Sequence, residues 1–232
     1  MLSLVPTPIG NLEDITARAL TALKTADAVY CEDTRRTRAL MTHFGLAKEL
    51  VRYDEHDPRC VDRMLTRLKG GESLALVSDA GSPAISDPGL SIVSRARQEG
   101  LAITALPGPS ALTAALAGSG LPADSFVFLG FLPRSSGKRK KILSQAATLK
   151  KTVVVYESPF RVAELLSEAA DVFGPDALAC AAREISKVYE EWISGSLQDV
   201  KGALSRKSEV LGEFVVLFHP AKERANGRHH QA

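Results

Sequence analysis

Acidic and small residues gather in one long loop that follows an apolar run. Residues 78–89 come directly after Leu74–Val77 and contain two Asp, two Pro and two Gly. Proline and glycine make this stretch too stiff for a disordered linker and too kinked for a helix or a strand. The backbone groups of such a loop suit a small polar ligand, and the Asp79 carboxylate accepts hydrogen bonds from amino or hydroxyl groups. A rigid connection without a ligand is the alternative, but a loop of this length in a compact domain favours a function.

A second group of charged and hydroxyl residues follows the apolar stretch 28–31. Residues 32–38 read Glu-Asp-Thr-Arg-Arg-Thr-Arg, at the point where a strand gives way to a helix. One interpretation is a helix capped by Asp33 or Thr34, with a solvated charged face. The other is a functional surface, because clustered charges at the end of a strand are typical of binding and catalytic sites. Both interpretations stay open.

A basic stretch lies in the second half of the chain. No acidic residue occurs between Ser125 and Tyr156. The basic residues there are Arg134, Lys138, Arg139, Lys140, Lys141, Lys150 and Lys151. This local density suits the phosphates of a nucleic acid, although the net charge of +2 supports no such argument for the whole chain. A solvated helix face is the alternative.

The sequence predicts no metal site and no common nucleotide-phosphate loop. His56 lies among carboxylates but lacks the helical spacing of histidine ligands, so a solvated loop is favoured. The three cysteines are scattered outside any C-x-x-C spacing and are expected to be reduced, buried thiols. Residues 6–11 contain a single glycine, which excludes the G-x-G-x-x-G and Walker patterns.

Strands and helices must alternate to hold these loops. Apolar runs predict strands at 2–5, 28–31, 50–53, 74–77 and 102–106. Helical spacing between them predicts helices at 14–25, 34–44, 61–68, 90–98 and 111–117. This alternation predicts a mainly parallel sheet, with ligands at the carboxyl ends of its strands. Beyond Gly118, further strands at 126–129, 152–156, 177–182, 189–194 and 213–218 predict a second α/β domain, in which helices are expected at 138–149, 160–172 and 198–204.

Length and composition fit two soluble domains. The chain has 232 residues, of which 45% are hydrophobic and 24% charged, and no apolar run approaches the length of a membrane span. The amino-acid composition changes at residues 118–124, which contain Gly and Pro. This change predicts domains at 1–118 and 119–221, followed by a polar tail at 222–232. The N-terminus has no basic region or cleavage site of a signal peptide, so a cytoplasmic protein is expected.

Several loops together resemble the tetrapyrrole-methylase-like family, most closely its branch that acts on ribosomal RNA. The matching segments in the first half are VPTPIGNL at 5–12, EDTR at 32–35, VSDAGSP at 77–83, SDPG at 86–89 and PGPS at 107–110. Those in the second half are GFLP at 130–133, YES at 156–158 and ARE at 182–184. The resemblance extends over nearly the whole chain, and the order of several motifs makes it specific.

The resemblance implies a two-domain α/β homodimer that binds S-adenosylmethionine in a cleft between its domains, with a parallel N-terminal and a mixed C-terminal sheet. It also implies methyl transfer to the ribose 2′-hydroxyl of a cytidine in small-subunit rRNA, either naked or within the assembled subunit. The expected cofactor-binding residues are Pro8, Asp79, Ala80, Gly81, Ser82, Pro107, Gly108, Ser110, Tyr156, Glu157 and Gly212. The expected RNA-binding residues are Glu32, Asp33, Arg35, Arg134, Lys138, Arg139, Lys140 and Lys141.

The chemistry of such a transfer needs alignment of the methyl group with the hydroxyl, exclusion of water and removal of a proton. A metal is not required. The catalytic residues expected are Glu157, Arg183, Glu184 and Lys187. Glu157, Glu184 and a Lys187 of lowered pKa are candidates for the base, and an interdomain salt-bridge network is the alternative for each.

Two other functions remain open. Methylation of a small tetrapyrrole needs no basic strip, so the acid-free stretch disfavours it. A non-catalytic RNA-binding or cofactor-sensing protein would tolerate loss of the polar residues at the strand ends, and their density disfavours this interpretation.

Overall fold

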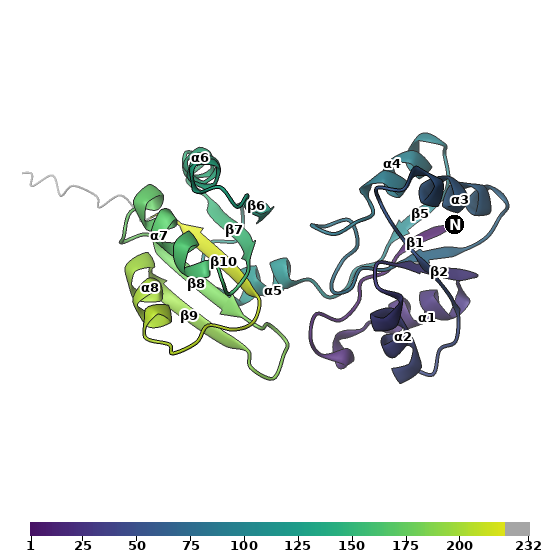
Figure 1. Ribbon diagram of the computed structural model, residues 1–232, viewed down its shortest axis with the longest axis horizontal. Coiled ribbons are helices and arrows are strands. Elements are labelled where there is room, and N and C mark those ends of the chain that lie inside the picture. Colours follow the sequence, from purple (N-terminus) through teal and green to yellow (C-terminus); the bar gives the residue numbers. More distant parts are fainter. Residues whose placement is uncertain (221–232) are drawn as a thin grey trace, which may run out of the picture. The chain divides into compact units, whose positions relative to one another are not determined.

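The structure is a computed structural model that describes residues 1–220, and it consists of two compact units. The first unit contains Met1–Ala114 together with Ile185–Val188, and the second contains the rest of the described chain. Figure 1 traces the chain through both. Helix α5 (Ala111–Gly118) begins in the first unit and ends in the second. The domain boundary expected after Gly118 stays a prediction, and the tail expected from residue 222 lies outside the described residues.

The first unit is built on a parallel five-stranded sheet. Its strands are β1 (Leu2–Leu4), β2 (Ala28–Cys31), β3 (Glu49–Arg52), β4 (Leu74–Leu76) and β5 (Ile103–Ala105), in the order β3-β2-β4-β1-β5. All four pairings are parallel. The central strands are apolar and buried on both faces, as a parallel sheet covered by helices requires. The parallel sheet expected from the sequence is therefore confirmed.

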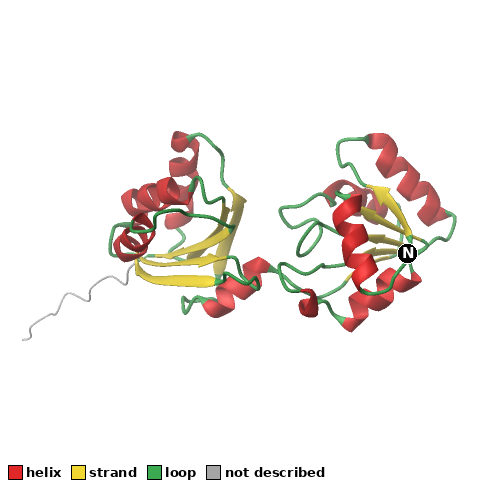
Figure 2. Cartoon of the chain, turned by 60° about the horizontal axis from the view of Figure 1, so that its bottom comes forward, coloured by secondary structure: helices red, strands yellow, loops and turns green. Residues whose placement is uncertain are grey.

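Helices cover both faces of this sheet, as Figure 2 illustrates. The chain leaves β1 and β4 in opposite directions across the sheet, so right-handed connections place the helices on opposite faces. One core packs α1 (Ala17–Thr25) and α2 (Thr34–His43) through side chains such as Leu23 and Met41. The other packs α3 (Pro58–Lys69) and α4 (Leu90–Gln98) through side chains such as Met64 and Ile92.

The helix expected at 14–25 is interrupted. A short 3-10 turn, η1, covers Leu12–Asp14, and α1 begins only at Ala17. Thr16 is the N-cap of α1, because its side-chain oxygen accepts a hydrogen bond from the Ala19 N–H at 3.0 Å. The local hydroxyl therefore starts a new helix where apolar spacing alone predicted a continuous one.

The second unit contains a mixed sheet, also as expected. Its strands are β6 (Phe126–Phe131), β7 (Thr152–Glu157), β8 (Leu178–Arg183), β9 (Glu191–Ser196) and β10 (Phe214–His219), in the order β6-β7-β10-β8-β9. Only β6 and β7 pair in parallel, and the other pairs are antiparallel. The carboxyl ends of β6 and β7 therefore meet at one edge of the sheet.

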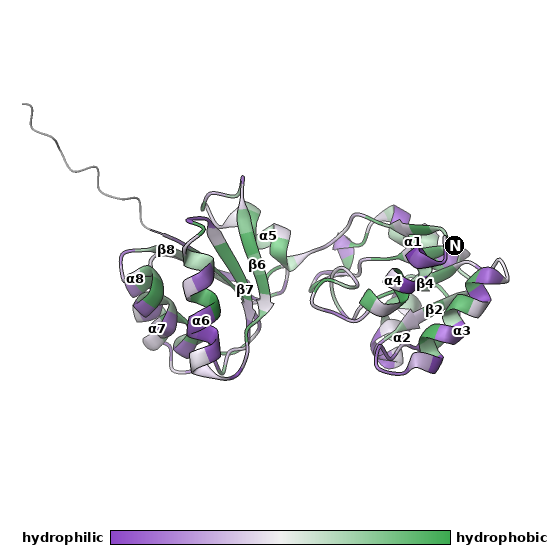
Figure 3. Ribbon diagram, turned by 90° about the horizontal axis from the view of Figure 1, so that it is seen from above, coloured by the Kyte–Doolittle hydropathy of each residue, from purple (hydrophilic) through white to green (hydrophobic). Residues whose placement is uncertain are grey.

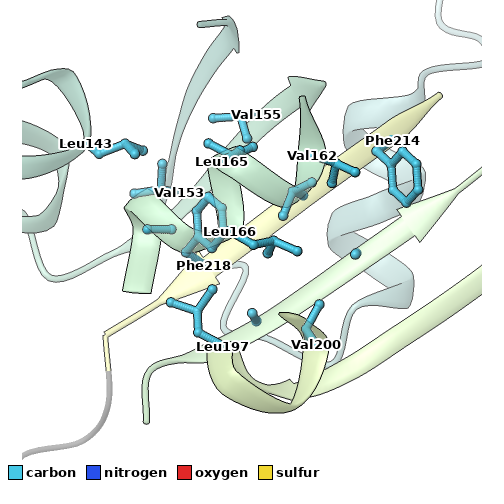
Figure 4. Packing of buried hydrophobic residues seen from close by; sticks show 14 of the residues in the cluster. Leu143, Val153, Val155, Val162, Leu165, Leu166, Leu197, Val200, Phe214 and Phe218 are labelled. Atoms are coloured by element: carbon cyan, nitrogen blue, oxygen red, sulfur yellow. The ribbon is translucent and has the colours of Figure 1, made fainter. Parts of the chain in front are cut away.

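Three helices cover one face of this mixed sheet. They are α6 (Ser136–Ala147), α7 (Val162–Phe173) and α8 (Leu197–Ser205). Val153 and Val155 of β7 point into the core beneath them, with Phe214 and Phe218 of β10 (Figure 4). Alternate residues of the same strands face the other side of the sheet. Within residues 1–220, none of the helices has the length and hydropathy of a membrane span.

Candidate functional site

The loops after β1 and β4 are joined by backbone hydrogen bonds at the carboxyl edge of the first sheet. The N–H groups of Thr7 and Gly81 each donate to the other residue's carbonyl, at 2.9 Å. The buried Thr7 hydroxyl donates to the carbonyl of Ser78 at 3.1 Å, and the Ser78 hydroxyl donates to that of Gly81 at 3.1 Å. The sequence-predicted cofactor residues Pro8 and Asp79–Ser82 are therefore held in one network.

Glycines let these loops approach the loop that follows β5. Gly81 has a positive φ of 81°, which an L side chain adopts only with strain. Gly108 packs so closely on Pro6 that a Cβ there would lie 2.7 Å from the proline Cβ. The Ser82 hydroxyl donates to the Pro109 carbonyl at 3.5 Å. The segment that contains Pro107, Gly108 and Ser110 thus lies beside the Asp79 loop.

Asp79 joins a fourth loop, the one after β2, to this network. Its carboxylate accepts a hydrogen bond from the Asp33 N–H at 3.3 Å and pairs with Arg36 at 3.3 Å. The Asp79 side chain keeps 30% of its surface exposed, so the carboxylate still faces solvent. Four loops from parallel strands therefore lie together at this edge, and the Asp79 carboxylate joins two of them, the loops after β4 and β2.

A pocket of about 420 Å³ opens between the loop after β1 and helix α2 in this unit. Its lining residues are Thr7, Pro8, Leu12, Arg36, Thr37, Ala39, Leu40, His43, Ser78 and Asp79. An apolar wall with a few convergent polar groups is typical of small-molecule sites. Two of the predicted cofactor residues, Pro8 and Asp79, line this pocket.

The charged segment after β2 begins with a helix cap, one of the two interpretations that the sequence left open. Asp33 is the N-cap of α2, and its carboxylate accepts hydrogen bonds from the Arg35 N–H and guanidinium, at 2.8 and 3.1 Å. These bonds lower the pKa of Asp33 to about 2. Arg35 is exposed, and burial together with nearby carboxylates raises the pKa of Glu32. The predicted cap is confirmed, while RNA contacts of Glu32, Asp33 and Arg35 stay a prediction.

Glu55 is a positioning residue that the sequence analysis did not identify. Its two carboxylate oxygens accept hydrogen bonds from the N–H groups of Gly89 and Ser91, at 3.1 and 2.9 Å. These groups begin α4, whose N-cap residue Gly89 has no side chain to satisfy them. Glu55 therefore fixes the end of the Asp79 loop. A helix that starts at Gly89 without a capping side chain is the signal from which an acceptor elsewhere in the chain could have been inferred.

Ionisation of Asp87 is expected to make the stability of the protein depend on pH. Burial and the charge of Asp79 raise the pKa of Asp87 to about 6. Between about pH 4 and this value the folded chain keeps a proton that the unfolded chain releases, so stability falls as pH rises. We expect Asp87→Asn to raise the free energy of unfolding at pH 7 by about 1–2 kcal/mol and to have no effect near pH 3.

Urea denaturation followed by circular dichroism across this pH range measures the effect. A wild-type curve parallel to that of the Asn variant from about pH 3 to pH 7 contradicts the raised pKa.

Residues 185–188 lie in sequence between two strands of the second unit but belong to the first. A Cβ at Gly10 would meet the Lys187 side chain at 2.3 Å and its backbone N at 3.2 Å, so only glycine fits at this contact. The Ser186 hydroxyl hydrogen-bonds to the Asp14 carboxylate. Lys187, a predicted catalytic residue, is therefore packed against the loop after β1.

Arg183 and Glu184, also predicted as catalytic, contact the polypeptide of the second unit. The Glu184 carboxylate accepts a hydrogen bond from the Glu213 N–H at 2.8 Å, and it fills the space that a Cβ at Gly212 would need. Arg183 pairs with Glu191 at 3.2 Å and donates to the Leu211 carbonyl at 3.3 Å. Both side chains thus brace the turn around the predicted cofactor residue Gly212.

Glu157 ends β7 with a carboxylate that is fully buried. Its Oε1 accepts one hydrogen bond from the Ser158 N–H at 2.7 Å. The same oxygen forms an ion pair with Arg161 at 2.6 Å. Its Oε2 has no hydrogen-bond partner among the described residues. A buried acceptor without a partner is costly, so this oxygen needs a donor that residues 1–220 do not supply. The neighbouring Tyr156 is half-buried and has contacts of its own.

Arg139 corrects one expectation for the basic stretch. Its side chain is 1% exposed, so its surface is not available to RNA phosphates. The guanidinium binds both oxygens of Glu168, at 2.7 and 2.9 Å, and donates to the Arg134 carbonyl at 2.7 Å. It also pairs with Glu164 at 2.7 Å. The residue forms a buried ion pair because its position on α6 faces α7.

The other basic residues of this stretch keep their charge at the surface. Arg134, Lys138 and Lys141 are exposed, and the hydrophilic colouring along α6 is visible in Figure 3. Lys140 is partly exposed and pairs with Asp171 at 2.7 Å. Of the RNA-binding residues predicted in the basic stretch, three are therefore exposed and a fourth, Lys140, is ion-paired.

Known proteins show clear similarity to this chain. A model of the Tetrapyrrole (Corrin/Porphyrin) Methylases matches residues 1–201. The ribosomal RNA small subunit methyltransferase I of Xylella fastidiosa strain Temecula1 is 43% identical over 225 residues, which cover 96% of this chain and 82% of the relative.

Solved structures share the fold at low identity. Diphthine synthase superposes with a TM-score of 0.73 at 19% identity, covering 96% of this chain and 91% of the other. The uroporphyrin-III C-methyl transferase of Thermus thermophilus, complexed with S-adenyl homocysteine, gives a TM-score of 0.62 at 21% identity and covers 93% and 96%. Together with the sequence matches, the two-sheet architecture shows that the chain belongs to the tetrapyrrole (corrin/porphyrin) methylase family of methyltransferases.

Proposed function

We propose that this protein is an S-adenosylmethionine-dependent methyltransferase that 2′-O-methylates a cytidine ribose in small-subunit rRNA. The observation that carries the proposal is the hydrogen-bonded cluster of four loops at the carboxyl edge of the parallel sheet, with the partly exposed Asp79 carboxylate in one of them. The similarity to a ribosomal RNA small subunit methyltransferase along almost the whole chain supports the substrate class. The target nucleotide and the 2′-hydroxyl rest on the resemblance of the motifs. An rRNA substrate is in keeping with a protein of the cytoplasm.

The polar groups of the chain fit S-adenosylmethionine. The cofactor offers amino and ribose hydroxyl donors, for which the partly exposed Asp79 carboxylate is a suitable acceptor. The partnerless Oε2 of Glu157 is a second acceptor of the required kind among the described residues. The remaining proposed contacts are Pro8, Ala80, Gly81, Ser82, Pro107, Gly108, Ser110, Tyr156 and Gly212. The pocket beside Pro8 supplies an apolar surface.

The chain contributes binding, orientation and proton removal. When bound, the cofactor supplies a methyl group already activated on a sulfonium. The hydrogen bonds between Thr7, Ser78 and Gly81 hold the loops rigid, so alignment costs little entropy on binding. Removal of the hydroxyl proton needs a positioned base, which typically contributes roughly 10²- to 10⁴-fold in rate. We propose Glu157, Glu184 or Lys187 as this base. Arg183, which precedes Glu184 in the sequence, is proposed as a further catalytic residue.

The exposed lysines of α6 are proposed to bind RNA phosphates. We expect the double variant Lys138→Gln/Lys141→Gln to weaken RNA binding. The slope of log affinity against log salt is expected to fall by about 0.7–0.9 for each phosphate that is no longer neutralised. Filter binding from about 50 to about 200 mM salt measures this slope. Lys140→Gln is the matched control, because Lys140 is already paired with Asp171. An unchanged slope in the double variant indicates a solvated helix face instead.

A homodimer is proposed as the working unit, on the basis of the family resemblance. Light scattering at micromolar concentration is expected to give twice the chain mass. A monomer that retains full activity excludes the dimer as a requirement.

Transfer of labelled methyl groups from S-adenosylmethionine tests the proposed reaction. Three acceptors are compared, namely small ribosomal subunits, protein-free small-subunit rRNA and uroporphyrinogen. Label in either RNA acceptor supports the proposal, and the better one identifies the natural form of the substrate. Label in the tetrapyrrole alone assigns the protein to the other branch of its family. RNA binding without any transfer identifies a non-catalytic protein.

A further inference from the structure

The face of the second sheet that lies opposite its three helices carries aromatic side chains. Phe126, Phe128 and Tyr156 all point to this face, because β6 and β7 pair in parallel with Phe126 beside Thr152 and Phe128 beside Val154. The alternate residues Val127 and Leu129 pack against the helical core instead.

A β-bulge adds Phe131 to the same face. The register of β6 against β7 shifts between Phe128 and Phe131, so that Phe131 is paired with Tyr156. Without the extra residue, alternation would direct Phe131 toward the helices. Gly130 permits the shift with a positive φ of 60°. The chain therefore uses a local irregularity to place one more ring on this face.

The rings pack edge to face against one another, and the Phe131 ring is exposed. Tyr156 contacts Phe128 and Phe131 with centroid distances of 4.9 and 5.5 Å, at interplanar angles of 68° and 62°. These contacts brace the Phe131 ring, which keeps 60% of its surface exposed. At the opposite edge of the sheet, α5 covers Trp192 of β9. Gly118 of α5 lies so close that a Cβ there would be 2.6 Å from the indole. The edge around Phe131 has no such cover within the described part of the second unit.

Positive charge adjoins the exposed ring. Arg134 is exposed three residues beyond Phe131, and Lys138 is exposed in the first turn of α6. The Arg139 guanidinium binds the carbonyls of Pro133 and Arg134, at 3.3 and 2.7 Å, and so fixes the connection between ring and charges. An aromatic face beside cations matches the two requirements of single-stranded RNA, a stacking surface for a base and a counter-charge for phosphate.

We propose that Phe131 is a stacking platform for an unpaired base of the RNA substrate, with Arg134 and Lys138 holding the adjoining phosphates. The proposal rests on the proposed RNA substrate and adds a contact to a base, whereas the lysines alone contact the backbone. Stacking tolerates any base, so this contact serves to hold an unpaired strand and not to read its sequence.

The test uses a mixed-sequence single-stranded RNA dodecamer that carries one 2-aminopurine, whose emission is quenched when it stacks. We expect Phe131→Leu to weaken binding between about fivefold and about a hundredfold and to reduce the quenching, since base–aromatic stacks contribute this much. The salt slope is expected to stay unchanged, because every phosphate keeps its cation. Phe131→Trp is expected to restore both affinity and quenching. Phe126→Leu is the matched control on the same face at the far end of β6.

Wild-type affinity and quenching in Phe131→Leu overturn the proposal. A change of oligomeric mass in Phe131→Leu with unchanged quenching also overturns it and assigns the face to a contact between copies of the chain. If the Leu variant does not fold, Phe131→Trp decides, since a stacked unlabelled dodecamer must quench the introduced indole. The readout needs no cofactor, so failed stacking leaves the methyl-transfer assay intact, and failed methyl transfer leaves the stacking result intact.

Discussion

Replacing Asp79 with alanine is expected to abolish measurable binding of S-adenosylmethionine while the protein stays folded. The carboxylate is proposed to accept hydrogen bonds from the cofactor, and bonds to a charged group contribute about 1.5–3 kcal/mol each. Its existing partners, the Asp33 N–H and Arg36, would be released at the same time. Arg36 in this pair is largely exposed and Asp79 is partly exposed, so loss of the pair is expected to cost at most about 1 kcal/mol of stability.

Titration calorimetry with S-adenosylmethionine measures this loss, and a thermal melt verifies the fold. Arg36→Gln is the matched control, since it breaks the ion pair but keeps the carboxylate. Retained binding in Arg36→Gln and lost binding in Asp79→Ala assign the effect to the carboxylate. Wild-type affinity in a folded Asp79→Ala removes this residue from the site, and a lost melting transition makes its role structural.

Replacing Arg139 with alanine is expected to lower the free energy of unfolding of the second unit by about 3–5 kcal/mol. The change leaves Glu168 buried, at 5% exposure, without its guanidinium partner. Burial raises the pKa of the Glu168 carboxyl, but the hydrogen bonds from Arg139 and Ser136 have the opposite and larger combined effect. The pKa is therefore lowered overall, and the group is charged in the folded protein. Without the guanidinium the carboxylate has to take up a proton or leave the core.

Urea denaturation followed by the emission of Trp192 measures this effect, because the only tryptophan lies in β9 of the second unit. The double variant Arg139→Met/Glu168→Leu is expected to recover most of the stability, since no unpaired charge remains. Lys140→Ala on the same helix removes a partly exposed ion pair as the control and is expected to change stability by less than about 1 kcal/mol. A loss below that level in Arg139→Ala contradicts the buried ion pair.

The parallel sheet and the loops at its carboxyl edge could be predicted because their signals are local. The runs at 28–31 and 74–77 are apolar on both faces, and each ends in charged or Gly- and Pro-rich residues. A chain that alternates such runs with helices has few topologies available. The clustering of the loops that contain Thr7, Asp33, Asp79 and Pro109 follows from that topology, since the carboxyl ends of parallel strands share one edge.

The features that sequence reasoning missed depend on distant partners. Arg139 lies among lysines with the same charge, and its buried partner Glu168 lies 29 residues later in the sequence. The role of Glu55 likewise needs Gly89, 34 residues away. The bulge at Gly130 had a local signal, a glycine within a strand, but its effect on Phe131 depends on the register against β7.

The most direct test of the proposed reaction is a map of ribose 2′-O-methyl groups in small-subunit rRNA from cells with and without this protein. The proposal predicts that one methylated cytidine is lost in the deletion strain, and that the wild-type gene restores it while the gene for Asp79→Ala does not. An identical methylation map in the wild-type and deletion strains would contradict the assignment of rRNA as the substrate.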